Sequence, residues 1–133
     1  LMITERLMQS TEAKEIPLQT ILVIDDNKPV RDLLIKALTK AGYQVVALSD
    51  GVGAVQTIRS EAVDLLVTDI VMPNKEGIET IEDVRAAFPG FPVIAISSNA
   101  FYLQLSSLLG VNAVIEKPIQ LSKLLSLIKS HLN

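Results

Sequence analysis

The sequence has no cysteine and only one histidine, and these two gaps exclude several kinds of chemistry. Without cysteine, the chain cannot form a disulfide, a catalytic thiolate or a thiolate metal site. The histidine, His131, is the third residue from the end of the sequence and has no neighbouring set of ligands. We expect it to be a solvated residue rather than a catalytic base or a phosphocarrier. Any site must therefore depend on carboxylates, hydroxyls and amines.

Excess positive charge and long apolar runs are also lacking. Twelve basic and fifteen acidic side chains give a formal charge of −3, which argues against direct binding of nucleic acid because nucleic-acid-binding domains usually carry a basic patch. Charged residues interrupt residues 1–19, so we expect neither a signal peptide nor a membrane span there. With 49% apolar residues in 133, the chain is long and apolar enough for one domain with a buried core. We expect a cytoplasmic protein.

The pattern of the sequence changes at Thr20. Residues 1–19 predict an N-terminal tail, frayed and flexible, and residues 20–133 predict one folded domain. Short β-branched runs without alternation are typical of strands that are buried on both faces. We predict central strands at 21–24, 63–68 and 92–96, and weaker edge strands at 43–48 and 112–115.

Helical periodicity falls between these runs. Apolar residues repeat at helical spacing after Asn27 and Pro29 and stop at Gly42, which predicts a first helix there. Further helices are predicted at about 52–60, 76–87, 101–109 and from 121 towards the C-terminus. Strict alternation of strands and helices predicts the α/β class: a parallel sheet with helices on both faces, doubly wound. Ligands bind such sheets beyond the carboxyl ends of the strands.

Polar residues stand at those strand ends. Asp25 and Asp26 follow the first predicted strand, Asp69 the third and Ser97 the fourth, and the fifth leads into Lys117. Three neighbouring carboxylates repel one another unless a cation sits among them, and Mg²⁺ suits such a site better than Ca²⁺. An ammonium and a hydroxyl can stabilise phosphate oxygens. Asp69 is then the carboxylate best placed to attack phosphorus.

Each of these residues has a simpler explanation when it is taken alone. An acidic pair before a helix is more often a turn and an N-cap. Asp69 could be a solvated strand end, Lys117 an ordinary surface lysine, and Ser97 carries almost no information. Only their joint placement at four strand ends favours a functional site.

At this point the sequence resembles a known family, the receiver domains of two-component response regulators. The similarity lies in four motifs, in the family's order and near its usual spacings: 21–27 (ILVIDDN), 69–73 (DIVMP) with Gly77, 92–97 (PVIAIS) and 116–118 (EKP). It covers about residues 20–132. The resemblance implies a flavodoxin-like (βα)5 sandwich with strand order 2-1-3-4-5.

The resemblance also implies roles for individual residues. Asp69 matches the phosphoacceptor and a Mg²⁺ ligand, Asp26 a direct ligand, Asp25 a ligand that often acts through water, and the backbone carbonyl of Val71 a further ligand. Ser97 matches the switch hydroxyl and Lys117 the phosphate-binding lysine. The bond between Lys117 and Pro118 is often cis in relatives, and Gly77 resembles a glycine that eases the turn before the third helix.

Two features depart from the family pattern or are unusual for it. Val114 stands where the family often has an aromatic residue, so coupling of the site to the surface is expected to be weaker or routed differently. The fourth helix, about 101–109, is more apolar than one buried face requires. Two explanations of the excess apolar residues stay open: an overlong face towards the core, or a contact patch for another protein that Leu127 extends.

The function implied by the resemblance is that of a phosphorylation-controlled signalling module, not an enzyme in the usual sense. A sensor histidine kinase or a histidine phosphotransfer protein would donate the phosphoryl group, with the first helix and its Arg31, Lys36 and Lys40 as the docking face. A homodimer or an effector contact would use the fourth and fifth helices. Two alternatives stay open: a pseudo-receiver that is never phosphorylated, and, far behind it, an aspartate-based phosphohydrolase. Whether the chain works alone or within a larger regulator is left open.

Overall fold

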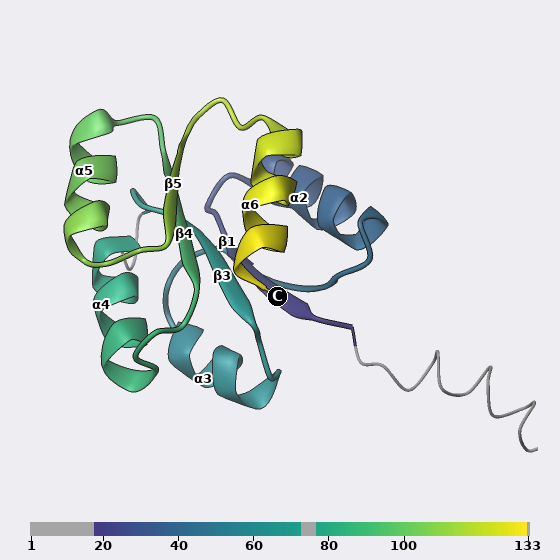
Figure 1. Cartoon of the computed structure of the whole chain (residues 1–133), viewed down its shortest axis with the longest axis horizontal. Helices are drawn as coiled ribbons and strands as arrows, with labels where there is room; N and C mark the ends of the chain where they lie inside the picture. Colours follow the sequence, from purple (N-terminus) through teal and green to yellow (C-terminus); the bar gives the residue numbers. More distant parts are fainter. Residues whose placement is uncertain (1–17, 73–76, 133) are drawn as a thin grey trace, which may run out of the picture.

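The computed structural model describes residues 18–72 and 77–132, and strands alternate with helices throughout them (Figure 1). Five strands and five helices lie in the described ranges: β1 Thr20–Ile24, α2 Lys28–Lys40, β2 Gln44–Leu48, α3 Ala54–Ser60, β3 Leu65–Asp69, α4 Gly77–Ala87, β4 Val93–Ser97, α5 Ala100–Leu108, β5 Ala113–Glu116 and α6 Leu121–His131. Most of the predicted tail, residues 1–17, lies outside the described part of the chain.

The five strands form one parallel sheet in the order β2-β1-β3-β4-β5, as expected for a flavodoxin-like sandwich. Every residue of β1, β3 and β4 is buried, which explains why these segments show no alternation of apolar and polar residues. The edge strands β2 and β5 are only partly buried, and their sequence signals are correspondingly weaker.

Two layers of helices cover the two faces of the sheet (Figure 1). Helices α3, α4 and α5 pack against one face, where Leu22, Leu66 and Ala95 point from the central strands. Helices α2 and α6 cover the other face, over Ile21 and Val67. Alternate residues of each central strand therefore contribute to opposite cores, and both cores fix how the strand ends are placed at the rim of the sheet.

Local signals account for most helix boundaries, with small differences from the predictions. The Asn27 side chain accepts a hydrogen bond from the Val30 amide at 3.0 Å and caps α2. Helix α3 begins at Ala54 rather than at Val52, because Gly53 adopts a left-handed conformation with φ of 79°. Helix α5 begins at Ala100, where Asn99 caps it.

The excess apolar surface of α5 does not face the sheet. Phe101 and Leu108 are 63% and 81% exposed, whereas Leu103 on the same helix is buried. The expected extension of this patch by Leu127 is wrong, since Leu127 is half-buried against the core beneath α2 and α6, on the opposite face. His131 is also half-buried rather than fully solvated, with its Nδ1 2.9 Å from the Leu127 carbonyl oxygen.

Within residues 18–72 and 77–132, no helix has the length and apolar character that crossing a membrane would require.

Candidate metal centre

Three carboxylates converge at the carboxyl end of the sheet. Asp25 and Asp26 directly follow β1 and Asp69 ends β3, and β1 and β3 are neighbours in the sheet. One carboxylate oxygen from each of the three lies within 4.8 Å of the others. Residues that are 43 positions apart in the sequence, Asp26 and Asp69, are therefore brought to one point by strand pairing.

The Asp25 carboxylate is almost fully buried, with 1% of the residue exposed. Its Oδ1 accepts a hydrogen bond from the Asn27 amide at 2.9 Å, but its Oδ2 has no hydrogen-bond partner among residues 18–72 and 77–132. The Lys117 Nζ lies 3.4 Å from that Oδ2, at ion-pair distance. A buried carboxylate oxygen without a hydrogen-bond donor is costly, and a bound cation would satisfy it.

Asp26 differs from Asp25 because its side chain is exposed. The peptide group that joins the two acids is held from the first turn of α2, where Arg31 Nη1 donates to the Asp25 carbonyl oxygen at 2.7 Å. Arg31 is half-buried, so it is not the freely exposed docking residue that we expected, whereas Lys36 and Lys40 are exposed as predicted.

Asp69 is 6% exposed and lies between opposing electrostatic influences. Its Oδ1 accepts from the Ile70 amide at 2.9 Å, and its Oδ2 lies 3.4 Å from Lys117 Nζ. Burial and the charge of Asp25 raise the pKa of Asp69 from 3.8 to about 6, against the lowering effect of Lys117. Lys117 therefore does not offset the cost of burying the Asp69 carboxylate beside Asp25.

Lys117 and Ser97 come from the other half of the sheet. Lys117 follows β5, its bond to Pro118 is cis, and its amide donates to the Ser97 carbonyl oxygen at 3.0 Å. Ser97 is buried, one residue beyond Ile96, which pairs with Asp69 in the sheet. The Ser97 Oγ accepts from the Asn99 amide at 3.0 Å, which leaves its own proton free to be donated.

Gly77 supports the site for a different reason from the one expected. It does not have the positive φ that a turn glycine often needs; instead, it packs against the strand end that carries Asp69. A Cβ at this position would lie 2.3 Å from the Asp69 carbonyl oxygen and 2.6 Å from the Ile70 Cα. The Gly77 amide also donates to the Ile70 carbonyl oxygen at 2.7 Å. Only glycine allows α4 to approach Asp69 so closely.

Val71 follows Asp69 by two residues, and 48% of it is exposed. A ligand role for its backbone carbonyl stays a prediction.

Two contacts near the site were not predicted from the sequence: the hydrogen bond from Arg31 to the Asp25 carbonyl oxygen and the packing of Gly77 against Asp69. The sequence gives no local signal for a side chain that reaches back six residues, as that of Arg31 does.

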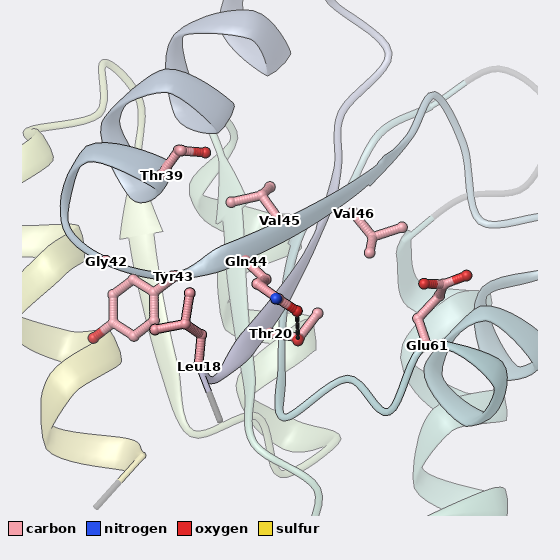
Figure 2. Close-up of a pocket in the computed structure, with 9 residues that line it drawn as sticks. All are labelled: Leu18, Thr20, Thr39, Gly42, Tyr43, Gln44, Val45, Val46 and Glu61. Atoms are coloured by element: carbon pink, nitrogen blue, oxygen red, sulfur yellow. Dashed lines mark hydrogen bonds between the residues drawn. The ribbon is translucent and has the colours of Figure 1, made fainter. Parts of the chain in front are cut away.

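A separate groove of about 540 Å³ lies at the opposite end of the strands (Figure 2). It is lined by the first residues of β1 and β2, Thr20 and Gln44, whose side chains share a hydrogen bond of 3.3 Å. Among the described residues that line it, Glu61 is the one acidic side chain, and none is cationic, so these residues offer neither a carboxylate cluster nor a positive charge for phosphate. Among the described residues, the carboxylate cluster with Lys117 is therefore the better candidate for a functional site than this groove.

The donors at the cluster fit a divalent metal ion. They are oxygen atoms of three carboxylates, and one of these oxygens is buried with no hydrogen-bond donor in the described part of the chain. Hard cations such as Mg²⁺ prefer this kind of donor set, usually with water or phosphate completing the coordination.

Comparisons with known proteins agree with this arrangement. Residues 21–129 match the family model described as the response regulator receiver domain. A CheY-like receiver domain protein from Methanospirillum hungatei is 29% identical, with a TM-score of 0.81 over 87% of this chain and 94% of that one. TrrA from Thermotoga maritima, in a complex with Mg²⁺ and BeF, is 28% identical, with a TM-score of 0.79 over 86% and 100% of the two chains. The chemotaxis protein CheY4 of Vibrio cholerae, at 23% identity, has a TM-score of 0.79 over 87% and 100%, and shares the fold.

The family model spans most of the chain, and the sheet order agrees with the CheY-like fold of the similar structures. This membership removes the aspartate-based phosphohydrolase as an alternative. The chain belongs to the response regulator receiver domain family, whose members are signalling domains of two-component systems.

Proposed function

We propose that this receiver domain accepts a phosphoryl group on Asp69 from a phosphohistidine donor, with Mg²⁺ held by Asp25, Asp26 and Asp69. The observation that carries the proposal is the position of Lys117, whose Nζ lies 3.4 Å from carboxylate oxygens of both Asp25 and Asp69. The same ammonium can therefore hold the unphosphorylated acceptor in place and contact a phosphoryl group attached to it.

Different residues of the chain have different roles in the phosphoryl transfer. A carboxylate oxygen of Asp69 attacks phosphorus; the phosphorus–nitrogen bond of the donor breaks, and an acyl phosphate forms. Lys117 and the Ser97 hydroxyl stabilise the phosphoryl oxygens by charge and hydrogen bonding. Bound Mg²⁺ would neutralise charge on the phosphoryl oxygens and on the crowded carboxylates. The backbone carbonyl of Val71 would complete the set of protein ligands.

The donor would be a sensor histidine kinase or a histidine phosphotransfer protein. Helix α2 offers exposed lysines for docking, and α5 offers the exposed side chains of Phe101 and Leu108 for a second copy or an effector. Val114 packs half-buried beneath α5, where a change at Ser97 could be transmitted by backbone movement rather than by rotation of an aromatic ring. Phosphorylation would then shift a balance between two surface states.

Incubation with acetyl phosphate and Mg²⁺, followed by intact-mass and peptide mass spectrometry, tests the proposal. We expect a gain of one phosphoryl group on the peptide that contains Asp69. The gain should disappear in Asp69→Asn and on addition of EDTA, and it should persist in Asp32→Asn, which alters an exposed carboxylate on α2.

NMR spectra with beryllofluoride supply a second readout that does not depend on the lifetime of the acyl phosphate. Chemical-shift changes centred on residues 69–71 and 97–99 are expected. A chain that takes up neither a phosphoryl group nor beryllofluoride would instead be a pseudo-receiver, which binds partners without being phosphorylated.

A further inference from the structure

We infer that Arg31 is a positioning residue for the metal centre: by holding the peptide group between Asp25 and Asp26, it sets the affinity for Mg²⁺. The inference rests on the proposed metal site. It concerns a residue that carries positive charge yet, by this reasoning, strengthens the binding of a cation.

All but one of the polar atoms of Asp25 take part in a hydrogen bond. Its amide donates to the Leu48 carbonyl oxygen at 3.2 Å, and its Oδ1 accepts from the Asn27 amide at 2.9 Å. Its carbonyl oxygen accepts from Arg31 Nη1 at 2.7 Å. These three contacts come from β2, the following loop and α2, and they leave Oδ2 free for Lys117 or a metal ion.

The position of the Asp26 side chain depends on the same peptide group, but this side chain lacks the hydrogen bonds that hold Asp25. Its side chain is exposed, and among residues 18–72 and 77–132 it makes no hydrogen bond or ion pair. Its carboxylate nevertheless has an oxygen within 4.8 Å of oxygens from Asp25 and Asp69. The orientation of the peptide between residues 25 and 26 therefore decides where the Asp26 carboxylate lies.

Arg31 is well suited to fix that orientation. It sits on α2, whose first turn is capped by Asn27, and the amide of Arg31 itself donates to the Asn27 carbonyl oxygen at 2.9 Å. Backbone and side chain of one residue thus contact two residues of the loop. A planar guanidinium loses little freedom when it forms such a bond, and α2 is anchored in the core through Leu34 and Leu38.

Two opposite predictions separate positioning from simple electrostatics. By charge alone, removing a cation near the carboxylates should tighten Mg²⁺ binding by about two- to fivefold. By positioning, removing the contact should weaken Mg²⁺ binding by about tenfold, as is usual when a group that orients a metal ligand is lost. The sign of the change in Kd therefore decides between them.

The experiment measures the Kd for Mg²⁺ by isothermal titration calorimetry and by NMR titration, without any phosphodonor. Arg31→Met keeps an apolar stem and removes both charge and donor. Lys36→Met makes the same change in charge at an exposed site five residues further along α2, about 7.5 Å along the helix axis. Arg31→Lys keeps the charge and one donor. Thermal unfolding and ¹H–¹⁵N spectra establish that each variant is folded.

We expect Arg31→Met to weaken binding about tenfold, Lys36→Met to leave it nearly unchanged, and Arg31→Lys to recover part of the loss. In the metal-free Arg31→Met variant, the amide signals of Asp26 and Asn27 should broaden or shift. If Arg31→Met does not fold, Arg31→Lys alone carries the test, with weaker binding expected by about threefold.

Equal or tighter binding by Arg31→Met overturns the inference, as does an equal loss in Lys36→Met. Should Arg31→Met not fold, unchanged binding by Arg31→Lys overturns it. A wild-type chain that binds no Mg²⁺ gives a different result, because it overturns the proposed metal site and this inference with it.

Discussion

Replacing Asp69 with asparagine should stabilise the metal-free protein at neutral pH. Burial and the neighbouring Asp25 raise the pKa of Asp69 from 3.8 to about 6, so the ionised form is less stable in the folded than in the unfolded chain. Since one pKa unit corresponds to about 1.4 kcal/mol, the ionised carboxylate destabilises the fold by about 2 to 3 kcal/mol. The uncharged amide of Asp69→Asn would remove this penalty while keeping nearly the same shape. The melting temperature should rise by about 6 to 10 °C.

The pH dependence of stability tests the sign of this effect. Between about pH 4 and 6 the folded wild-type chain holds a proton on Asp69 that the unfolded chain has lost, so its stability falls as the pH rises. The advantage of Asp69→Asn should therefore be near zero at pH 4, grow through pH 6 and be complete by pH 7.5. Urea unfolding at a series of pH values without Mg²⁺, monitored by circular dichroism, measures it.

Addition of Mg²⁺ provides a second, independent comparison. The wild-type chain should gain about 1.4 kcal/mol for each tenfold excess of Mg²⁺ over its Kd, because the metal binds only the folded state. Asp69→Asn should gain less, having lost one ligand. Asp32→Asn is the control: its carboxylate pairs with Lys28 on the surface of α2, and the change in stability should stay within about 0.5 kcal/mol at every pH. A wild-type chain more stable than Asp69→Asn at pH 7.5 without metal would refute the reasoning.

Three further outcomes follow from the packing around the site. Gly77→Ala should lower the free energy of unfolding by about 2 kcal/mol and slow phosphorylation, because its Cβ would lie 2.3 Å from the Asp69 carbonyl oxygen; urea unfolding and the acetyl phosphate assay measure the two effects. Lys117→Met should slow phosphorylation about tenfold or more while Mg²⁺ binds at least as tightly, a split that mass spectrometry and calorimetry can detect and that equal losses in both would contradict. Leu38→Ala, at a fully buried position of α2, should lower stability by about 3 kcal/mol, whereas Leu33→Ala, 50% exposed on the same helix, should change it by less than about 1 kcal/mol; similar losses in urea unfolding would argue against the described core.

The sequence predicted the alternation of strands and helices and the residues at the strand ends, because both depend on local patterns. Buried parallel strands need apolar residues on both faces, so 21–24 and 92–96 could be identified as short apolar runs without alternation. The strand order came from the family resemblance rather than from periodicity. Helix starts were less certain: Gly53 moved α3 by two residues through a backbone conformation that the sequence does not specify.

The sequence also named the acids, the hydroxyl and the lysine, but it could not assign their environments. Asp25 and Asp26 are adjacent and chemically alike, yet one is buried and the other exposed, because only packing decides which carboxylate points into the rim. Likewise, Leu127 and Leu108 are both leucines on helices that pack against the sheet, and the placement of α5 and α6 on opposite faces of the sheet separates their environments.

By itself, then, the sequence determined the class of fold and the chemistry available at the ends of its strands, since residue types and short-range periodicity carry that information. Only the tertiary structure decided which groups meet. It brought Lys117 to two acids, pressed Gly77 against the Asp69 backbone and let Arg31 reach the peptide between Asp25 and Asp26. These contacts depend on distances across the sheet and between helix and loop, which no local pattern in the chain encodes.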